Sequence, residues 1–418
     1  MGATAVVCYD LAMQKPLVAV VSFPGNNCEV ESLRAIKDSG MDAIFFRWND
    51  DRTKLKNVDG YFIPGGFSYE DRGRSGMVAA RDPLMQFLHE EAAAGKTIIG
   101  NCNGAQILIE SGLIPLDTGL AMSLARNAVK QNGDFSAPGF LSEWVWIKPS
   151  CTADRCATSN WEGTMHLPIA HGEGRFITTD PEVISELKKN NQIAFQYCSE
   201  DGVVSEDPAV APNGSILAIA GICNPAGNVV ALMPHPERTP LGKPYFDSLK
   251  KWIEKGRSPV TKHAWRKSSW KLPDRAPSGT EIFIDTIIVN NEERTVEQAA
   301  RRVLPNLKLK QWKYFSLTSK KPEELLGDLA VFNPNKERAF IRQGSSVTRW
   351  SADEQKGVPV TTPVFAGTLL LRKDLPETSP DESGICYMVQ NISDTDLQKR
   401  ALLEIFANPH ASTLERIF

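Results

Sequence analysis

A cysteine at a predicted sharp turn is the residue of this sequence best placed to act as a nucleophile. Cys102 lies in a Gly-Asn-Cys-Asn-Gly segment, residues 100–104, between an apolar run at 97–99 and a helical segment at 105–111. A strand that turns sharply into a helix needs glycine where the two backbones pack together. At the N-terminus of such a helix a thiolate is favoured over a thiol. The pattern predicts a reactive cysteine; the alternative is that Cys102 is a small buried hydrophobe, as many free cysteines are.

A cysteine nucleophile needs a base and a group that orients the base. His235 and Glu237 are two residues apart around Pro236, at the end of an apolar strand-like run. In an extended chain, residues i and i+2 project to the same side, and proline stiffens that geometry. A carboxylate beside an imidazole fixes its tautomer and stabilises the imidazolium. The spacing therefore predicts a base and its orienting group; a loop histidine without a catalytic role is the alternative.

Backbone N–H groups are the simplest donors for an oxyanion. Gly65 and Gly66 follow another predicted strand, where glycines allow backbone to approach a ligand closely, although they could equally form only a turn. Together with the N–H of Asn103, the residue after the nucleophile, they are candidates for an oxyanion hole.

A zinc site is the rival interpretation of the cysteines and histidines. Cys151 and Cys156 are five residues apart, as are His166 and His171, which roughly resembles a two-cysteine, two-histidine site. The cysteine spacing is at the loose limit of such sites, and Pro168 interrupts the histidine pair.

The elements that must position these residues alternate between strand and helix. Apolar runs predict strands at 17–23, 43–47, 60–63 and 97–99, and helical spacing predicts helices at 28–37 and 105–111. Such alternation is typical of an α/β fold with an open parallel sheet and helices on both faces. Its chemistry lies at the carboxyl ends of the strands. Further strands at 144–147, 192–197 and 228–233 and a helix at 243–254 complete a first domain, residues 1–256.

The rest of the chain divides into a linker and a second region. Residues 257–279 are rich in Lys, Arg, Trp, Ser and Pro without periodicity, which indicates a basic linker lying across a neighbouring surface; a nucleic-acid arm is the minor alternative. Residues 280–418 predict an α+β region of two repeats. Strands are expected at 282–289, 309–317, 364–371 and 385–390, and helices at 296–304, 323–332 and 396–406. Each copy is expected to finish with an amphipathic helix ended by Asn-Pro, at Asn333 and Asn408.

Composition limits the possible environments and partners. The 418 residues are 42% hydrophobic and 23% charged, and the net charge is −3, so nothing draws the whole chain to nucleic acid or membrane. No apolar run reaches about 18 residues, the length of a membrane-spanning helix. Eight scattered cysteines indicate reduced thiols, and we expect a cytoplasmic protein.

Together, these motifs resemble the class I glutamine amidotransferases, and among them the glutaminase subunits of phosphoribosylformylglycinamidine synthases. The matching segments are 23–28 (Phe-Pro-Gly-Asn-Asn-Cys), 64–69 (Pro-Gly-Gly-Phe-Ser-Tyr), 100–108 (Gly-Asn-Cys-Asn-Gly-Ala-Gln-Ile-Leu), 168–176 (Pro-Ile-Ala-His-Gly-Glu-Gly-Arg-Phe) and 233–238 (Met-Pro-His-Pro-Glu-Arg). The resemblance implies a flavodoxin-like first domain. It also argues against zinc, because His171 belongs to a family motif that binds no metal.

The resemblance further implies a thioester mechanism on L-glutamine. Cys102 would attack the side-chain amide, and His235, oriented by Glu237, would move the proton that lets ammonia leave. The substrate-binding residues would be Gly65, Gly66, Asn103 and Gln106, the last one helical turn after the nucleophile.

The same resemblance implies a partner. We recognise no ATP-binding synthetase domain and expect no cofactor in this chain, so ATP and Mg²⁺ would bind a separate large synthetase subunit. The C-terminal region resembles the small accessory subunit of the same synthase in part. Its helices, with Leu397, Ala401, Leu402 and Ile405 on one face, need either a partner surface or each other to bury that face. The alternatives are a glutaminase for another acceptor and a non-catalytic assembly protein on the same fold.

Overall fold

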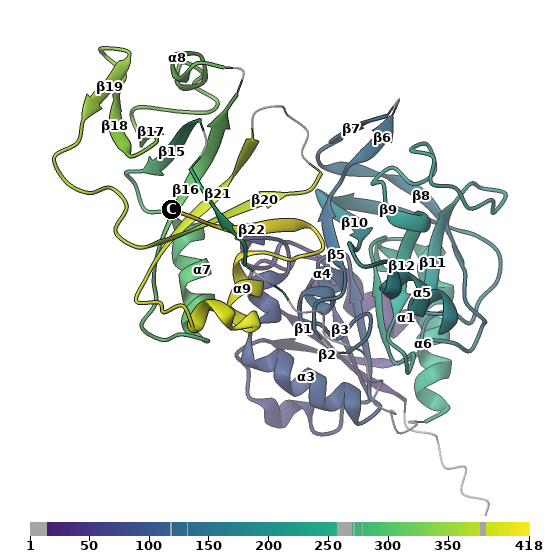
Figure 1. Ribbon diagram of the computed structural model, residues 1–418. Coiled ribbons are helices and arrows are strands. Elements are labelled where there is room, and N and C mark those ends of the chain that lie inside the picture. Colours follow the sequence, from purple (N-terminus) through teal and green to yellow (C-terminus); the bar gives the residue numbers. More distant parts are fainter. Residues whose placement is uncertain are drawn as a thin grey trace, which may run out of the picture.

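The chain forms two regions that lie side by side, each built on a nine-stranded sheet (Figure 1). The computed structural model describes residues 15–117, 119–131, 133–256, 270, 272–277, 279–318, 320–376 and 382–418. Most of the predicted basic linker lies outside these residues.

The sheet of the first region positions the predicted site. Its strands, in spatial order, are β2 (Asp42–Arg47), β1 (Leu17–Ser22), β3 (Gly60–Ile63), β4 (Thr97–Asn101), β13 (Val229–Leu232), β12 (Ile219–Cys223), β11 (Ile193–Cys198), β8 (Leu141–Pro149) and β9 (Met165–His171). From β2 to β13 the strands are parallel, as predicted. From β12 to β9 they are antiparallel, so the predicted open parallel sheet is correct only for the first five strands. Two small antiparallel sheets of two strands each lie outside it: β5 (Ser123–Arg126) with β10 (Glu173–Ile177), and β6 (Val129–Gln131) with β7 (Asp134–Ser136).

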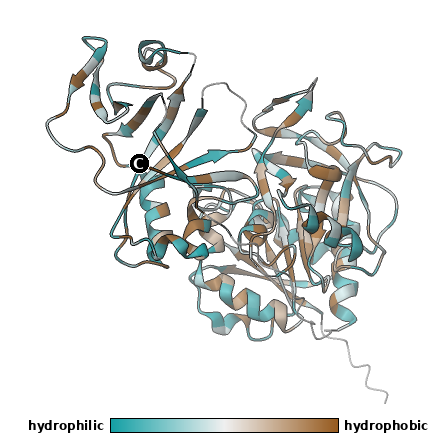
Figure 2. Ribbon diagram, viewed as in Figure 1, coloured by the Kyte–Doolittle hydropathy of each residue, from teal (hydrophilic) through white to brown (hydrophobic). Residues whose placement is uncertain are grey.

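Helices cover both faces of this sheet, as an α/β fold requires. They are α1 (Glu29–Asp38), α2 (Met77–Ala80), α3 (Pro83–Ala93), α4 (Asn103–Glu110), α5 (Pro181–Lys189) and α6 (Lys243–Glu254). One hydrophobic core joins the sheet to α3, α4 and α5 through residues such as Leu88 and Leu108, and another joins it to α1 and α6 through Ile36 and Phe246. Figure 2 shows apolar residues along the strands and hydrophilic ones on the outer faces of helices such as α3.

The second region is a single, mostly antiparallel sheet with three α-helices in its described part. The strands, in spatial order, are β14 (Asp274–Arg275), β22 (Ser412–Ile417), β20 (Thr368–Asp374), β21 (Glu382–Gln390), β16 (Lys308–Leu317), β15 (Thr280–Thr286), β17 (Glu337–Gln343), β18 (Ser346–Ser351) and β19 (Lys356–Pro359). The one parallel pair is β14 with β22. The helices are α7 (Asn291–Arg301), α8 (Pro322–Leu326) and α9 (Arg400–Phe406).

The strand order of the second region supports the predicted two repeats. About the central β16–β21 pair the order is symmetric, because β15 and β20 flank that pair and are themselves flanked by β17 and β22. The two Asn-Pro turns also match: the side chains of Asn333 and Asn408 each accept a hydrogen bond of 3.0 Å from the backbone N–H two residues later. The division into repeats nevertheless remains a prediction.

Three details of the second region differ from our expectations. Helix α8 ends at Leu326, before Gly327, so the Asn333-Pro334 turn leads into β17 and does not end a helix. The helix predicted at 396–406 is broken at Lys399, whose backbone is extended, into a 3-10 turn and α9. Strand β14 lies inside the segment predicted as linker, and Arg275 anchors it by ion pairs to Glu382 and Glu415.

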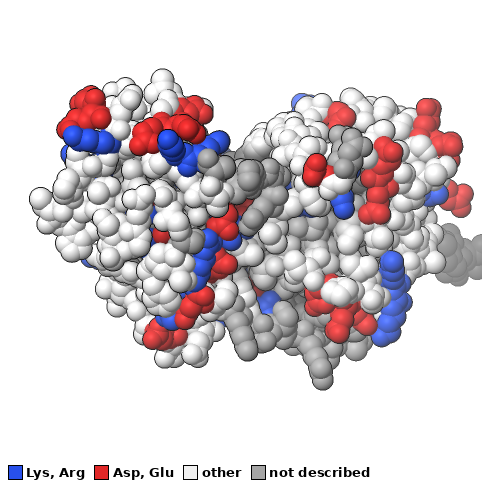
Figure 3. Space-filling model, turned by 45° about the horizontal axis from the view of Figure 1, so that its top comes forward, with Lys and Arg blue, Asp and Glu red and all other residues white. Residues whose placement is uncertain are grey.

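The apolar faces of α7 and α9 are covered by each other, by their own sheet and by α2 of the first region, whereas α8 packs within the second region. Leu402 and Ile405 of α9 are buried, whereas Ala401 is exposed, and α9 shares a core with Met77 and Val78 of α2. On the face shown in Figure 3, acidic and basic side chains are interspersed. In the described part of the chain, no helix combines the length and apolar character needed to cross a bilayer.

Candidate active site

Three neighbouring parallel strands deliver the predicted residues to one edge of the first sheet. Strand β3 runs into Gly65 and Gly66, β4 into Cys102, and β13 towards His235. Because β4 pairs with both β3 and β13, the three loops meet at the carboxyl edge, where α/β folds place their chemistry.

Cys102 occupies the strained turn that the glycine spacing predicts. Its φ of 50° and ψ of −109° are unusual for a residue with a side chain, and it is the residue before α4. A Cβ at Gly100 would lie 2.5 Å from the Gly104 carbonyl oxygen, and one at Gly104 would lie 2.0 Å from the Ile63 carbonyl oxygen. The turn therefore requires both glycines. Cys102 is 3% exposed, with its thiol at the N-terminus of a helix.

His235 and Glu237 form the predicted pair. The Nδ1 atom of His235 lies 2.6 Å from Glu237 Oε1, and both side chains are buried. Burial alone would disfavour the imidazolium, but the Glu237 carboxylate and then Cys102 outweigh it and raise the pKa of His235 well above its ordinary value. Burial likewise opposes ionisation of Glu237, yet the imidazole keeps the pKa of that carboxyl low. The pair is therefore an imidazolium held by a carboxylate.

Two buried residues fix the carboxylate in turn. Asn101 donates from Nδ2 to Glu237 Oε2 at 3.1 Å, and its Oδ1 accepts a bond of 3.1 Å from the Tyr245 hydroxyl. Asn101 and Tyr245 are fully buried. This chain of hydrogen bonds runs from α6 through β4 to the imidazole and leaves Glu237 one orientation.

The remaining ring nitrogen of His235 faces the sulfur atoms. Nε2 is buried and has no hydrogen-bond partner among the described residues, while the ring interacts with the thiols of both Cys102 and Cys28. Burial is the main reason why the pKa of Cys28 is raised. The neighbouring His171 is also buried, which together with the charge of His235 lowers its pKa to about 3 and keeps it neutral. Cys102 and His235 are thus the two groups placed to exchange a proton.

The candidate oxyanion donors lie beside the thiol. Asn103 is the first residue of α4, so its N–H has no acceptor within the helix. Gly66 has a φ of 140° and forms an isolated antiparallel bridge with Asn26. The two hydrogen bonds of this bridge are donated by the N–H groups of Phe67 and Asn27. The Gly66 N–H takes no part in them. A Cβ on Gly65 would lie 2.6 Å from the His235 ring. Gly65 therefore lets backbone approach the reacting groups, and Gly66 lets it pack against the Asn26–Asn27 backbone.

Side chains of α4 hold these loops together. The Oδ1 atom of Asn103 accepts from Asn26 Nδ2 at 3.2 Å and from the Ser68 N–H at 3.0 Å, which fastens the Gly65–Gly66 turn to the helix. Gln106 accepts from Asn103 Nδ2 at 2.8 Å and donates to the carbonyl oxygen of Glu173. The predicted binding residues thus converge, with Gln106 one turn below the nucleophile.

The zinc candidates do not converge. His166 and His171 are five positions apart on β9, so they point to opposite faces of the strand. His166 stacks on Trp146 with ring centroids 4.3 Å apart, whereas His171 lies near His235. Within the described ranges, the side chains with metal-ligand spacing are Cys28, His235 and Glu237, whose ligand atoms lie within 4.8 Å of one another. Two of these already bond to each other as the base and its orienting group.

Reasoning from the sequence missed the supporting residues. Asn101 lies inside the Gly-x-Cys-x-Gly pattern. It is a polar residue at the end of a buried strand, and this could have indicated that its side chain bonds a residue of the site. Cys28 belongs to segment 23–28, which matches the family motif, but no role at the site was predicted for it. Tyr245 belongs to a helix 144 positions from Asn101, so no local pattern pointed to it.

Comparisons with known proteins identify relatives of the first region. Residues 15–261 match the model of the CobB/CobQ-like glutamine amidotransferase domain. A relative from Methanothrix thermoacetophila, named phosphoribosylformylglycinamidine synthase subunit PurQ, is 43% identical over 260 residues, covering 58% of this chain and 99% of the relative. One of the same name from Thermomicrobium roseum is 42% identical over 221 residues, covering 53% of this chain and 86% of the relative. A solved structure titled "Structure of PurLQS from Thermotoga maritima" is 30% identical, with a TM-score of 0.44, and covers 57% of this chain and 99% of that one.

The chain therefore belongs to the CobB/CobQ-like glutamine amidotransferases, and its first region is a glutamine amidotransferase domain. The match to the PurQ relative from Methanothrix thermoacetophila covers 99% of that relative.

Proposed function

We propose that this chain is the glutaminase component of a phosphoribosylformylglycinamidine synthase, hydrolysing L-glutamine to glutamate and ammonia. The observation that carries the proposal is the buried Cys102, His235 and Glu237 arrangement at the carboxyl edge of the sheet. The PurQ relatives are named as subunits of that synthase, and their name is the reason for proposing that the synthase reaction consumes the ammonia.

The geometry supports a thioester mechanism. His235 already carries a proton on Nε2, so Cys102 acts as the thiolate of a thiolate–imidazolium pair and attacks the side-chain amide carbon of glutamine. The developing oxyanion accepts hydrogen bonds from the Gly66 and Asn103 N–H groups, which cost no reorganisation at the moment of reaction. His235 then protonates the amide nitrogen, the C–N bond breaks, and ammonia leaves. Water, deprotonated by His235, attacks the thioester, releases glutamate and restores Cys102.

The remaining predicted residues bind the substrate in this proposal. Gly65 keeps the space beside the His235 ring open, and Gln106 holds the wall of the glutamine pocket through Asn103 and the Glu173 carbonyl group.

The acceptor reaction needs a partner. We place ATP, Mg²⁺ and the nucleotide on a separate large synthetase subunit, to which this chain delivers ammonia. The cysteines in the described part of the chain are free, which fits the reducing environment of the cytoplasm.

We also propose that residues 280–418 act as an accessory unit of the same synthase. The support is the symmetric strand order and the matching Asn-Pro turns, which fit two copies of one small α+β unit joined through β16 and β21. In this chain the unit is covalently attached to the glutaminase domain.

The test of the proposed function is reconstitution. The tagged full chain should retain the large synthetase subunit in a pull-down, and the mixture should convert formylglycinamide ribonucleotide with glutamine and ATP. If the chain hydrolysed glutamine but did not support that synthesis, and instead retained another synthetase, it would be a glutaminase for a different acceptor. A chain that binds the subunit but never hydrolyses glutamine would be an assembly protein.

The pH dependence tests the role of Glu237. His235 has a pKa above its ordinary value of 6.5, so its protonated form persists at neutral pH and is lost as the pH rises through the folded-state pKa. Glu237→Gln removes the main charge that raises this pKa. The alkaline limb of the kcat/KM profile for glutamine hydrolysis should therefore move to lower pH, by about one to two units. The exposed Glu182→Gln variant is the control, and an unmoved limb in Glu237→Gln would mean that another group titrates.

A further inference from the structure

The loop that follows the Gly65–Gly66 turn has an unfavourable backbone. Tyr69, Glu70 and Asp71 have φ values of 52°, 57° and 53°, so three consecutive residues with side chains adopt the left-handed conformation. Such a run persists only where surrounding contacts hold it, and strained segments of this kind cluster at functional sites.

The strained loop contacts the candidate glutamine site directly. Asp71 accepts a hydrogen bond of 3.3 Å from Asn103 Nδ2, and the Ser75 N–H donates to Glu173 Oε2 at 3.0 Å. Burial, then the nearby Glu173 carboxylate, raises the pKa of Asp71 to about 7. Because Asn103 and Glu173 are also the partners of Gln106, a shift of this loop would disturb the wall of the glutamine pocket.

Residues of the C-terminal region hold the loop from the other side. The Gly73 N–H donates to Glu292 Oε1 at 3.2 Å, and the Gly73 carbonyl accepts from the Arg372 guanidinium at 2.6 Å. Arg372 is 4% exposed. Arg72 donates to the Thr295 hydroxyl at 3.0 Å. Both polar groups of Gly73 are therefore satisfied by residues more than 200 positions away.

Packing on either side of Gly73 comes from the same region. Met77 and Val78 of α2 are buried in one core with Val296 of α7 and Leu402 of α9, and Tyr69 packs against that core. The loop is thus bracketed by apolar contacts to the C-terminal region.

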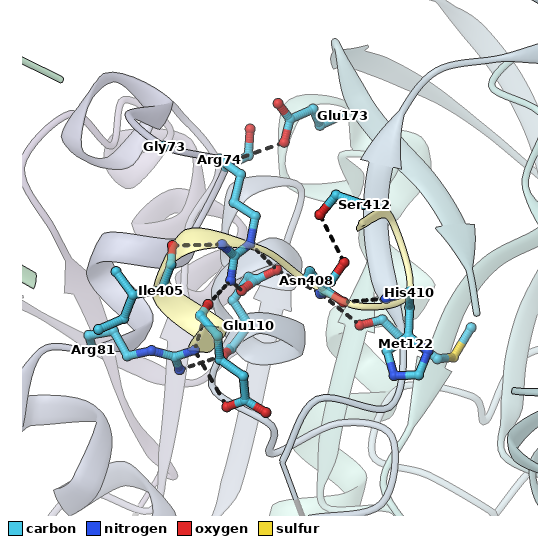
Figure 4. A network of polar contacts seen from close by, with 12 residues as sticks. Gly73, Arg74, Arg81, Glu110, Met122, Glu173, Ile405, Asn408, His410 and Ser412 are labelled. Carbon is cyan, nitrogen blue, oxygen red and sulfur yellow. Dashed lines mark hydrogen bonds and ion pairs between the residues drawn. The ribbon is translucent and has the colours of Figure 1, made fainter. Parts of the chain in front are cut away.

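A buried polar network extends the contact to the nucleophile helix (Figure 4). Arg74 donates to Glu110 Oε1 and Oε2 at 3.0 and 2.6 Å and to the Ile405 carbonyl oxygen at 3.0 Å. Asn408 donates to the same Glu110 carboxylate at 2.9 Å. Glu110 ends α4, the helix that begins after Cys102, so the C-terminal region is bonded to both the loop and the helix of the site.

We propose that Arg372 and Glu292 are positioning residues for the glutaminase reaction, holding Gly73 so that Asp71 and Ser75 stay against Asn103 and Glu173. The inference rests on the proposed glutaminase function and extends it. The C-terminal region, besides any contact with a partner subunit, is then a structural part of the glutamine site in its own chain. Neither residue touches the reacting atoms.

Two alkylating reagents separate this role from a general loss of structure. The diazoketone analogue of glutamine must occupy the glutamine pocket before it reacts with Cys102, whereas iodoacetamide reports only the reactivity of the thiol. In the full-length chain, Arg372→Gln and Glu292→Ala should lower the efficiency of diazoketone inactivation about tenfold, chiefly through weaker reversible binding. Iodoacetamide rates should stay within about twofold of the parent chain. Arg372→Lys and Glu292→Gln retain a donor and an acceptor and should recover most of the loss.

The matched control is Arg342→Gln. Arg342 is another buried arginine of the same sheet, but its bonds go to Glu281 and Phe418 within the C-terminal region. It should lower the thermal unfolding temperature without changing diazoketone efficiency. Parent-like diazoketone efficiency in both Arg372→Gln and Glu292→Ala would overturn the inference, and if Arg372→Gln does not fold, Glu292→Ala decides. A parent chain that never reacts with the diazoketone would instead contradict the proposed function.

Discussion

Cys102→Ser should abolish glutamine-dependent synthesis by the complete enzyme, with a fall of roughly ten-thousandfold or more in turnover. A hydroxyl ionises far less readily than a thiol, and the site stabilises a thiolate through a helix N-terminus and a buried imidazolium. Added ammonium salts should still support synthesis, because the large subunit receives ammonia without the thioester. The measurement is the rate of product formation with each nitrogen source.

Cys28→Ser is the matched control for this substitution. Cys28 also lies beside the imidazole, but it does not occupy the strained turn before α4. It should retain most of the glutamine-dependent activity. If the Cys102→Ser chain kept substantial glutaminase activity while the Cys28→Ser chain lost it, the nucleophile would be Cys28 and the assignment of Cys102 would be wrong.

His235→Ala should lower glutamine hydrolysis about a thousandfold or more, the second largest effect that we expect. Without His235 nothing in the described site gives a proton to the leaving nitrogen or takes one from the attacking water, since burial keeps His171 neutral with a pKa of about 3. Glu237→Gln should cost less, because it leaves the base in place and removes only its orientation and charge. Steady-state glutaminase assays measure both.

The control for the histidine is His166→Ala, since His166 stacks on Trp146 outside the site. Its activity should be close to that of the parent chain. Negligible effects of His235→Ala and Glu237→Gln alike would show that the base lies elsewhere.

The parts of the site that could be predicted are those encoded by local spacing. Gly100 is required because it packs against the backbone of Gly104, four positions later, and His235 and Glu237 meet because they are two positions apart. Such requirements leave a short pattern in the sequence. The predicted class, an α/β domain with a parallel sheet at the site, was confirmed for the same reason, since alternating strands and helices are local features.

The supporting contacts could not be predicted because they join distant segments. Tyr245 reaches Glu237 only through Asn101, and Arg372 reaches Gly73 across 299 positions. The antiparallel half of the first sheet depends on how hairpins close, which periodicity does not reveal. The apolar faces of the C-terminal helices were predicted to need a partner surface or each other, and the structure shows α7, α9 and α2 of the first region sharing one core.

The most direct test of the whole account is to trap the thioester. The full chain is mixed with glutamine, quenched in acid within one turnover, and digested for mass spectrometry. We predict a glutamyl group on the peptide that contains Cys102, lost on treatment with hydroxylamine and absent from the Cys102→Ser chain. Glutamine turnover with no adduct on Cys102, or with the adduct on Cys28, would contradict the account.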